Sequence, residues 1–303
     1  MTVLKEAGLE KVNDDIFYAE AFEDVIRRTS GYLEAGYPIH FTGPSGVGKT
    51  SLALYIAKKR KRPVMLMHGN HELSNKDLIG SYTGYSSKKV IDNYIHSVYK
   101  KDEKVSETWK NGRLLEAVKN GYTLVYDEFT RSKPSTNNLF LSILEEGILP
   151  LYGTKHSQPF IKVHPEFSVL FTSNPEEYAG VYQTQEALLD RLITIPLQPL
   201  GQSEEAVIVS KKTGIDETEA KNVTAFVSRL RESCKKKGNE GPSLRASIMI
   251  ALLAAKADLP IKGDNEEFQQ LVMDIVWYQV RKAFEKETDS KVQNVILSEC
   301  KKI

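Results

Sequence analysis

Residues Gly43 to Thr50 read GPSGVGKT and match the pattern G-x-x-x-x-G-K-[ST] without a gap. Glycines at these spacings let the backbone fold into a tight loop whose N–H groups point at an anion. Lys49 supplies a point charge for β- and γ-phosphates, and the Thr50 hydroxyl is suited to ligate Mg²⁺. The pattern therefore predicts a nucleoside triphosphate site formed by Gly43, Pro44, Ser45, Gly46, Val47, Gly48, Lys49, Thr50 and Ser51.

A pair of carboxylates ends a later apolar segment, in the stretch TLVYDE at residues 123–128. The end of a strand is where an α/β sheet places its chemistry. Asp127 could hold Mg²⁺ through water. Glu128 could orient the attacking water and remove its proton as a general base. The alternative is an Asp-Glu pair that only caps a helix, and the phosphate loop earlier in the chain favours the functional interpretation.

One amide and two arginines complete the candidate set. Asn174 ends an apolar segment and could hydrogen-bond the attacking water or the γ-phosphate, although Asn before Pro also forms plain turns. Arg191 could pair with an acid on its own helix, or reach the nucleotide of a neighbouring subunit as an arginine finger. Arg245 lies in the first turn of a predicted helix, where a cation opposes the helix dipole. It therefore needs an anion, either a γ-phosphate or a surface carboxylate.

Hydrophobic periodicity indicates the elements that position these residues. We expect helices at 17–32, 51–59 and 135–146, strands at 39–42, 64–67, 123–128, 167–171 and 193–196, and a hairpin at 148–164. From about residue 200 the pattern is helical throughout. The fold class is thus α/β, with a parallel sheet flanked by helices in a nucleotide-binding domain at 1–200 and a smaller all-α lid domain at 201–303.

A long excursion separates the second predicted strand from the carboxylate strand, at residues 68–112. Residues 77–80 and 84–85 are rich in turn-forming types, and Val90, Ile91, Tyr94, Ile95 and Val98 have the spacing of an amphipathic helix. His68 and His71 resemble a metal pair, but no third ligand is evident.

Composition limits the partners and the compartment. The 303 residues are 41% hydrophobic and 27% charged, as in an ordinary soluble protein, and the net charge of +1 gives no attraction to nucleic acid or anionic lipid. A nucleic-acid motor is disfavoured, because no basic stripe with interleaved aromatics is present. The longest apolar run is too short for a membrane span. Cys234 and Cys300 lack metal-site spacing and fit a reducing cytoplasm, and the charged N-terminal stretch has no signal-peptide character.

The order of these motifs resembles the MoxR group of AAA+ ATPases, in which a similar excursion precedes the carboxylate strand and a hairpin precedes the Asn strand. Within that group the chain is similar to the ATPases that serve gas-vesicle assembly. The segments that carry this second resemblance are PIHFTGPSGVGKTSLA, MHGNHELSNKDLIGSYTGY, WKNGRLLEAVKNGYTLVYDEFTRSKP, LFLSILEEGILPL, LFTSNPEEYAGV and ALLDRL.

The resemblance implies a role for each candidate residue. Residues 43–50 would be Walker A, and Asp127 and Glu128 would be Walker B. Asn174 would be sensor 1, Arg191 the arginine finger and Arg245 sensor 2. Related proteins also carry an arginine near the subunit interface at the place of Arg131.

The resemblance also implies partners. It implies a hexameric ring that hydrolyses Mg·ATP and remodels gas-vesicle structural or assembly proteins, in the cytoplasm or at the vesicle. Two alternatives remain: a MoxR-type chaperone that activates or inserts metal into a metalloenzyme, and a nucleotide-gated binding module whose hydrolysis is incidental. The segment from Val90 to Val105 is longer and more charged than the group leads us to expect, so client contacts of the excursion are not carried over.

Overall fold

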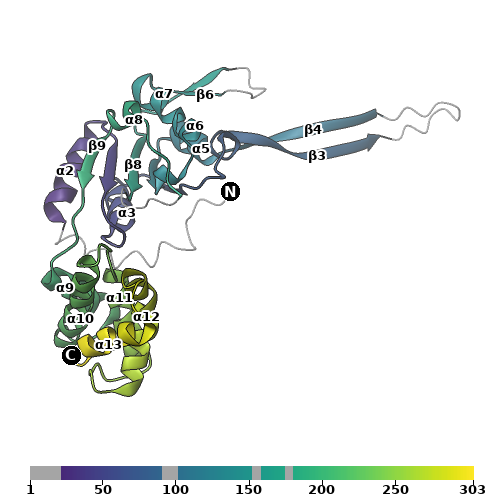
Figure 1. Cartoon of the computed structure of the whole chain (residues 1–303). Coiled ribbons are helices and arrows are strands. Elements are labelled where there is room, and N and C mark those ends of the chain that lie inside the picture. The colour runs from purple at the N-terminus through teal and green to yellow at the C-terminus, as the bar shows by residue number, and fades with distance from the viewer. Residues whose placement is uncertain (1–21, 91–101, 152–157, 175–179) are drawn as a thin grey trace. The chain divides into compact units, whose positions relative to one another are not determined.

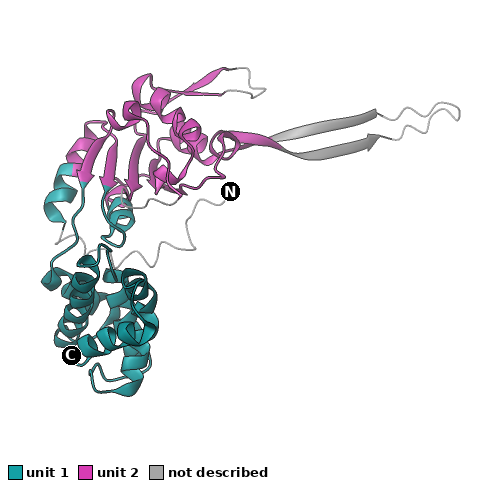
Figure 2. Ribbon diagram, viewed as in Figure 1, with its two compact units in different colours: residues 1–28, 42–55, 196–303 teal, residues 29–41, 56–195 magenta. Residues whose placement is uncertain are grey.

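The computed structural model describes residues 22–90, 102–151, 158–174 and 180–303. The chain forms two compact units (Figure 2). One comprises residues 1–28, 42–55 and 196–303, and the other comprises residues 29–41 and 56–195. The units thus do not follow chain order, because residues 42–55 belong with the C-terminal helices. The expected domain boundary near residue 200 stays a prediction.

A five-stranded sheet of order β2-β5-β8-β1-β9 organises the α/β region (Figure 1). β5 pairs in parallel with β2 on one side and with β8 on the other. β5 and β8 are buried along their whole length, as expected for parallel strands covered on both faces. The strands are β1 (Ile39–Thr42), β2 (Val64–His68), β5 (Thr123–Asp127), β8 (Ser168–Ser173) and β9 (Ile193–Pro196).

The helices interleave with these strands along the chain as the sequence predicts. They are α2 (Glu23–Glu34), α3 (Lys49–Lys59), α4 (Asn75–Ile79), α5 (Arg113–Asn120), α6 (Pro134–Asn137), α7 (Leu139–Glu145) and α8 (Glu186–Leu189), with a 3₁₀ turn η2 (Phe129–Arg131). The predicted helix at 135–146 is therefore two short helices. The parallel sheet flanked by helices confirms the predicted α/β fold class.

A cluster of aromatic side chains fixes the ends of the two central strands. Tyr126 on β5 and Phe171 on β8 have ring centroids 5.9 Å apart, and Phe129 and Phe140 each lie 5.1 Å from the Phe171 ring. The Tyr126 hydroxyl donates to the side-chain oxygen of Asn137 at 3.0 Å, which satisfies the one polar group of this ring. Burial raises the pKa of Tyr126 to about 12. This packing fixes the positions of the strand ends from which the residues after Tyr126 and Phe171 continue.

The excursion differs from the prediction. The turn-rich expectation for residues 77–80 and 84–85 is wrong. Residues 77–79 belong to α4, and the others lie in β3 (Gly80–Val90), which forms a two-stranded antiparallel sheet with β4 (Asp102–Asn111). Tyr82 pairs with Trp109 across it, with ring centroids 5.0 Å apart. Cross-strand aromatic pairs stabilise antiparallel strands, and Trp109 also packs against the hydrophobic core. Local periodicity does not show such long-range contacts. Val90 ends β3 instead of starting a helix, and the rest of the expected amphipathic helix lies outside the described residues.

The predicted hairpin at 148–164 is confirmed in its two arms. β6 (Ile148–Pro150) pairs antiparallel with β7 (Phe160–Lys162), with Leu149 opposite Ile161. Residues 152–157 of its connection lie outside the described residues.

The C-terminal region is helical, as predicted. It contains α9 (Gln202–Thr213), α10 (Glu217–Lys235), α11 (Leu244–Lys256), α12 (Glu266–Ala283) and α13 (Asp289–Cys300). Apolar side chains form a buried stripe on α10, where Val223, Phe226, Val227 and Leu230 have no exposed surface. Both cysteines are buried as well, and burial raises the pKa of each thiol to about 11.

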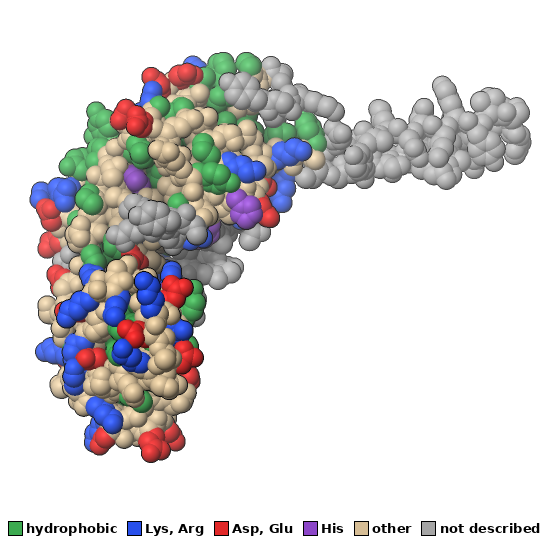
Figure 3. Space-filling view, viewed as in Figure 1, with side chains coloured by type: hydrophobic (Ala, Val, Ile, Leu, Met, Phe, Trp, Pro, Cys, Tyr) green, Lys and Arg blue, Asp and Glu red, His purple; other side chains and the backbone are tan. Residues whose placement is uncertain are grey.

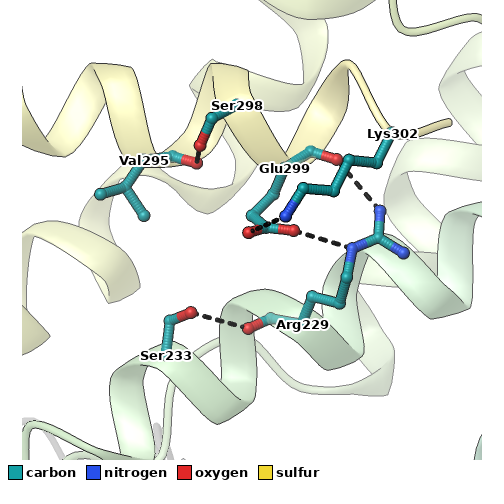
Figure 4. A network of polar contacts seen from close by, with 6 residues as sticks. All are labelled: Arg229, Ser233, Val295, Ser298, Glu299 and Lys302. Carbon is teal, nitrogen blue, oxygen red and sulfur yellow. Dashed lines mark hydrogen bonds and ion pairs between the residues drawn. The ribbon is translucent and has the colours of Figure 1, made fainter.

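Charged contacts tie α10 to the end of α13 (Figure 4). The Nε of Arg229 donates to Oε2 of Glu299 at 2.8 Å, and its Nη2 donates to the Glu299 carbonyl at 3.0 Å. Lys302 contacts the other carboxylate oxygen of Glu299 at 2.6 Å. On the face shown in Figure 3, Lys and Arg side chains are interspersed with Asp and Glu over the helical region. Across the described residues we find no helix with the length and apolar character that a membrane crossing requires.

Candidate nucleotide site

The glycine-rich loop begins directly after β1 and adopts a backbone that requires glycine. Gly43 has φ +148° and Gly46 has φ +83°, both in the region that residues with a side chain rarely adopt. A Cβ added at Gly43 would lie 2.4 Å from the Leu197 carbonyl oxygen, and one added at Gly46 would lie 2.6 Å from the Ser243 side chain. Neighbouring atoms therefore lie too close to Gly43 and Gly46 for either position to carry a side chain.

Lys49 opens α3 and is buried, with 9% of its surface exposed. Its ammonium group donates to the carbonyl oxygens of Gly43 and Pro44, each at 2.7 Å. Thr50 follows in the first turn of α3. The glycine-rich loop therefore leads into a helix N-terminus that carries a positive charge and a hydroxyl group. This donor set fits a phosphate chain carrying Mg²⁺, for which the Thr50 hydroxyl would be a protein ligand.

The loop also contacts the start of α11, which belongs to the same compact unit. Ser243 is the N-cap residue of α11 and lies against Gly46. Arg245 is exposed in the first turn of this helix, as the sequence predicts. The structure thus brings the arginine's helix to the glycine-rich loop.

Asp127 ends β5 and is buried, with 8% of its surface exposed. Its Oδ1 accepts a hydrogen bond from the Thr172 hydroxyl of β8 at 2.6 Å, and its Oδ2 lies 3.3 Å from Nδ1 of His68 on β2. The backbone N–H of Gly69 donates to the Asp127 carbonyl at 2.8 Å. The carboxylate is thus oriented from both neighbouring strands.

Glu128 has a left-handed backbone, with φ 51° and ψ 43°. A residue with a side chain pays on the order of 1–2 kcal/mol for this conformation, so its surroundings must hold it there. Its N–H donates to the Thr172 hydroxyl at 2.9 Å, and its carboxylate lies 2.7 Å from Nε of Arg131. A Cβ on Gly69 would lie 2.1 Å from the Glu128 carbonyl oxygen, so glycine is required there. The Glu128 side chain is 43% exposed.

Asn174 directly follows β8 and is buried, with 7% of its surface exposed. Its neighbour Ser173 lies 2.8 Å from Nε2 of His40 on β1, and Nδ1 of the same ring lies 3.1 Å from the Thr194 hydroxyl on β9. Burial lowers the pKa of His40 to about 4, so the ring is neutral near pH 7. The strand that delivers Asn174 is therefore tied through one imidazole to β1 and β9.

Arg191 lies between α8 and β9 and pairs with an acid, but the acid is not on its own helix. Its guanidinium donates to Glu145 at the end of α7 and to the Ala187 carbonyl. The guanidinium is 29% exposed. The finger assignment of Arg191 remains a prediction.

Sequence reasoning missed several residues that support the site. Thr172 and Ser173 directly precede Asn174 in the sequence, and His40 lies within the expected strand at 39–42. Polar residues inside or at the end of a buried strand were the available signal, because such groups need partners. Within the described residues, no group of three or more His, Cys, Asp or Glu side chains could hold a metal ion.

The chain is similar to known proteins over most of its length. The AAA domain family, dynein-related subfamily, matches residues 38–192. Gas vesicle ATPase GvpN of Ancylobacter aquaticus is 45% identical over 255 residues, which cover 84% of this chain and 71% of that protein. GvpN1 of Halobacterium salinarum is 42% identical over 227 residues, covering 75% and 65%. GvpN of Haloferax mediterranei is 38% identical over 232 residues, covering 77% and 66%.

The sheet, the glycine-rich loop and the family match define an ATPase of the AAA+ class. Within that class, the chain belongs to the gas vesicle ATPase GvpN family. It spans 71%, 65% and 66% of the three relatives, in the order given above.

Proposed function

We propose that residues 43–51 together with Asp127, Glu128 and Asn174 bind and hydrolyse Mg·ATP. The observation that carries this proposal is the paired strand ends: β5 and β8 are parallel neighbours, and Thr172 joins the Asp127 carboxylate to the Glu128 backbone. Further support is the buried Lys49 at the start of α3. Thr50 and Asp127 would hold Mg²⁺, which when bound neutralises phosphate charge and orients the γ-phosphate.

In this mechanism each residue has a separate task. Lys49 and the loop N–H groups bind the β- and γ-phosphates. Glu128 removes a proton from the attacking water, and the Asn174 amide orients that water. Arg245 senses the γ-phosphate from the first turn of α11. Arg191 acts on the site of a neighbouring subunit in a ring, where such a finger typically contributes about 10³–10⁵-fold to turnover.

We further propose that this activity serves gas-vesicle assembly through the remodelling of a protein partner, in a ring of six subunits. The support is the family to which the chain belongs, whose members carry the name gas vesicle ATPase. The alternative is a chaperone that loads or activates a metalloenzyme.

A complementation experiment tests this proposal. A gas-vesicle-forming host that lacks its own gene of this family would receive the wild-type chain, Lys49→Ala or Glu128→Gln. We expect only the wild type to restore buoyant cells, because both variants remove the ATPase cycle at different steps. Restored buoyancy with Lys49→Ala would show that the role in assembly does not need ATP. If none of the three chains restores vesicles but the wild type changes the metal content of a bound enzyme, the chaperone alternative is favoured.

A further inference from the structure

The contact between the glycine-rich loop and α11 depends on a short segment that α10 holds. Ser243 lies against Gly46, and the residue before it, Pro242, is buried. Leu244 and Ala246 are also buried, at 4% and 5% exposure, so the first turn of α11 packs tightly while Arg245 points outward. Whatever fixes Pro242 therefore fixes the start of this helix against the loop.

Arg231 on α10 makes that contact. Its Nε donates to the Pro242 carbonyl at 3.0 Å. Its two terminal nitrogens donate to both oxygens of Glu205 on α9, at 2.9 and 3.2 Å. The guanidinium thus joins α9, α10 and the connection to α11 through three hydrogen bonds.

The burial of Glu205 and Arg231 restricts how the Arg231 guanidinium can be oriented. Glu205 is 3% exposed, and the Arg231 side chain is 15% exposed. A buried carboxylate needs a partner, and only a planar guanidinium offers two terminal donors and an Nε donor in a fixed fork. Glu205 therefore sets the plane of the guanidinium, and that plane aims Nε at the Pro242 carbonyl.

We propose that Arg231 and Glu205 are positioning residues that hold the start of α11, and with it Arg245, against the phosphate-binding loop. This inference rests on the proposed function, because it gives Arg245 the γ-phosphate as its partner. The pair touches no substrate. It sets how well the site distinguishes ATP from ADP, which differ only in the phosphate that Arg245 senses.

The chain supplies a matched control two residues away. Arg229 also lies on α10 and also pairs through Nε with a carboxylate at 2.8 Å, but its partner is Glu299 at the end of α13 (Figure 4). Loss of Arg229 removes a similar ion pair from the same helix without touching Pro242. Arg231→Met and Arg229→Met should therefore lower the melting temperature to a similar degree and differ in nucleotide preference.

The experiment measures the dissociation constants of ATP and ADP, with Mg²⁺, for the full chain and its variants. We expect Arg245→Ala and Arg231→Met each to lower the ATP-over-ADP preference about tenfold, and the double variant to be no lower than Arg245→Ala, since residues acting as a unit are not additive. Arg229→Met should keep the wild-type preference. Glu205→Gln, which preserves shape, should show a smaller loss in the same direction and replaces Arg231→Met if that chain does not fold.

Three results overturn the inference, and they differ in what else they remove. If Arg245→Ala lowers the preference while Arg231→Met and Glu205→Gln behave like Arg229→Met, the positioning role is wrong and the proposed function stands. If Arg245→Ala leaves the preference unchanged, the sensing role of Arg245 is wrong and the inference fails with it, while the proposed hydrolysis of ATP stands. If the wild-type chain binds no ATP, the proposed function itself fails.

Discussion

Thr172 bonds to Asp127 through a side-chain contact of 2.6 Å that crosses from β8 to β5. The same hydroxyl accepts the N–H of the next residue, Glu128, at 2.9 Å. One buried oxygen thus orients the proposed Mg²⁺ ligand and restrains the left-handed backbone of the proposed base. The Thr172 hydroxyl donates its hydrogen to the Asp127 carboxylate, and its oxygen accepts the backbone N–H of Glu128. One group therefore makes both contacts.

Thr172→Val tests this coupling. Valine keeps the shape of threonine but leaves a buried carboxylate oxygen and a backbone N–H without their partner, at a cost of about 1–3 kcal/mol each. We expect turnover to fall about 10–100-fold with a smaller change in ATP affinity, because the loop that binds phosphate is untouched. Steady-state kinetics and nucleotide titration measure both. Thr172→Ser retains the hydroxyl and should stay within a few-fold of wild type; equal losses in the two variants would argue against the role of the hydroxyl.

His40 gives the protein a defined acid sensitivity. Its folded-state pKa of about 4 lies below the ordinary value of 6.5, so the unfolded chain binds the proton more readily. The stabilisation is therefore present above pH 6.5 and is lost as the pH falls towards 4, amounting to about 3 kcal/mol at most. His40→Gln should flatten the dependence of the free energy of unfolding on pH across this window. Denaturant titrations of the two proteins at several pH values measure this dependence. If it is the same in wild type and His40→Gln, the acid sensitivity does not come from His40, because the two proteins have the same carboxylates.

Arg191 leads to a prediction about subunit cooperation. Arg191→Ala and Lys49→Ala subunits should each be inactive, the first for lack of a finger and the second for lack of phosphate binding. In an equal mixture, about a quarter of the interfaces would combine an intact loop with an intact finger, and activity should recover to that extent. ATPase assays of mixed and separate variants measure it. Activity that is only the sum of the parents would assign Arg191 to the ion pair with Glu145 alone.

Local signals predicted most of the α/β fold. The strand at Ile39–Thr42 is confirmed with the same bounds, and the strand ending at Asp127 was recognisable because a buried apolar run stops in carboxylates. The phosphate loop needs only short-range geometry, and Gly43 and Gly46 carry the positive φ that its motif anticipates.

Long-range relationships could not be predicted in the same way. The bond from Thr172 to Asp127 depends on β8 being the neighbour of β5, and strand order is not contained in periodicity. The β3–β4 ribbon was missed because its stabilising pair, Tyr82 and Trp109, lies far apart in the chain. Arg231 gave no signal either, since an arginine on a helix is usually solvated and its buried partner Glu205 belongs to another helix.

The most direct test of the account is the behaviour of Glu128→Gln. The variant keeps the size of the side chain and removes its ability to take a proton. We predict ATP affinity close to that of the wild type and turnover lowered at least about 100-fold, the usual contribution of a general base. Glu146→Gln, an exposed acid after α7, should leave both quantities unchanged. Turnover at the wild-type rate in Glu128→Gln would contradict the proposed hydrolytic site.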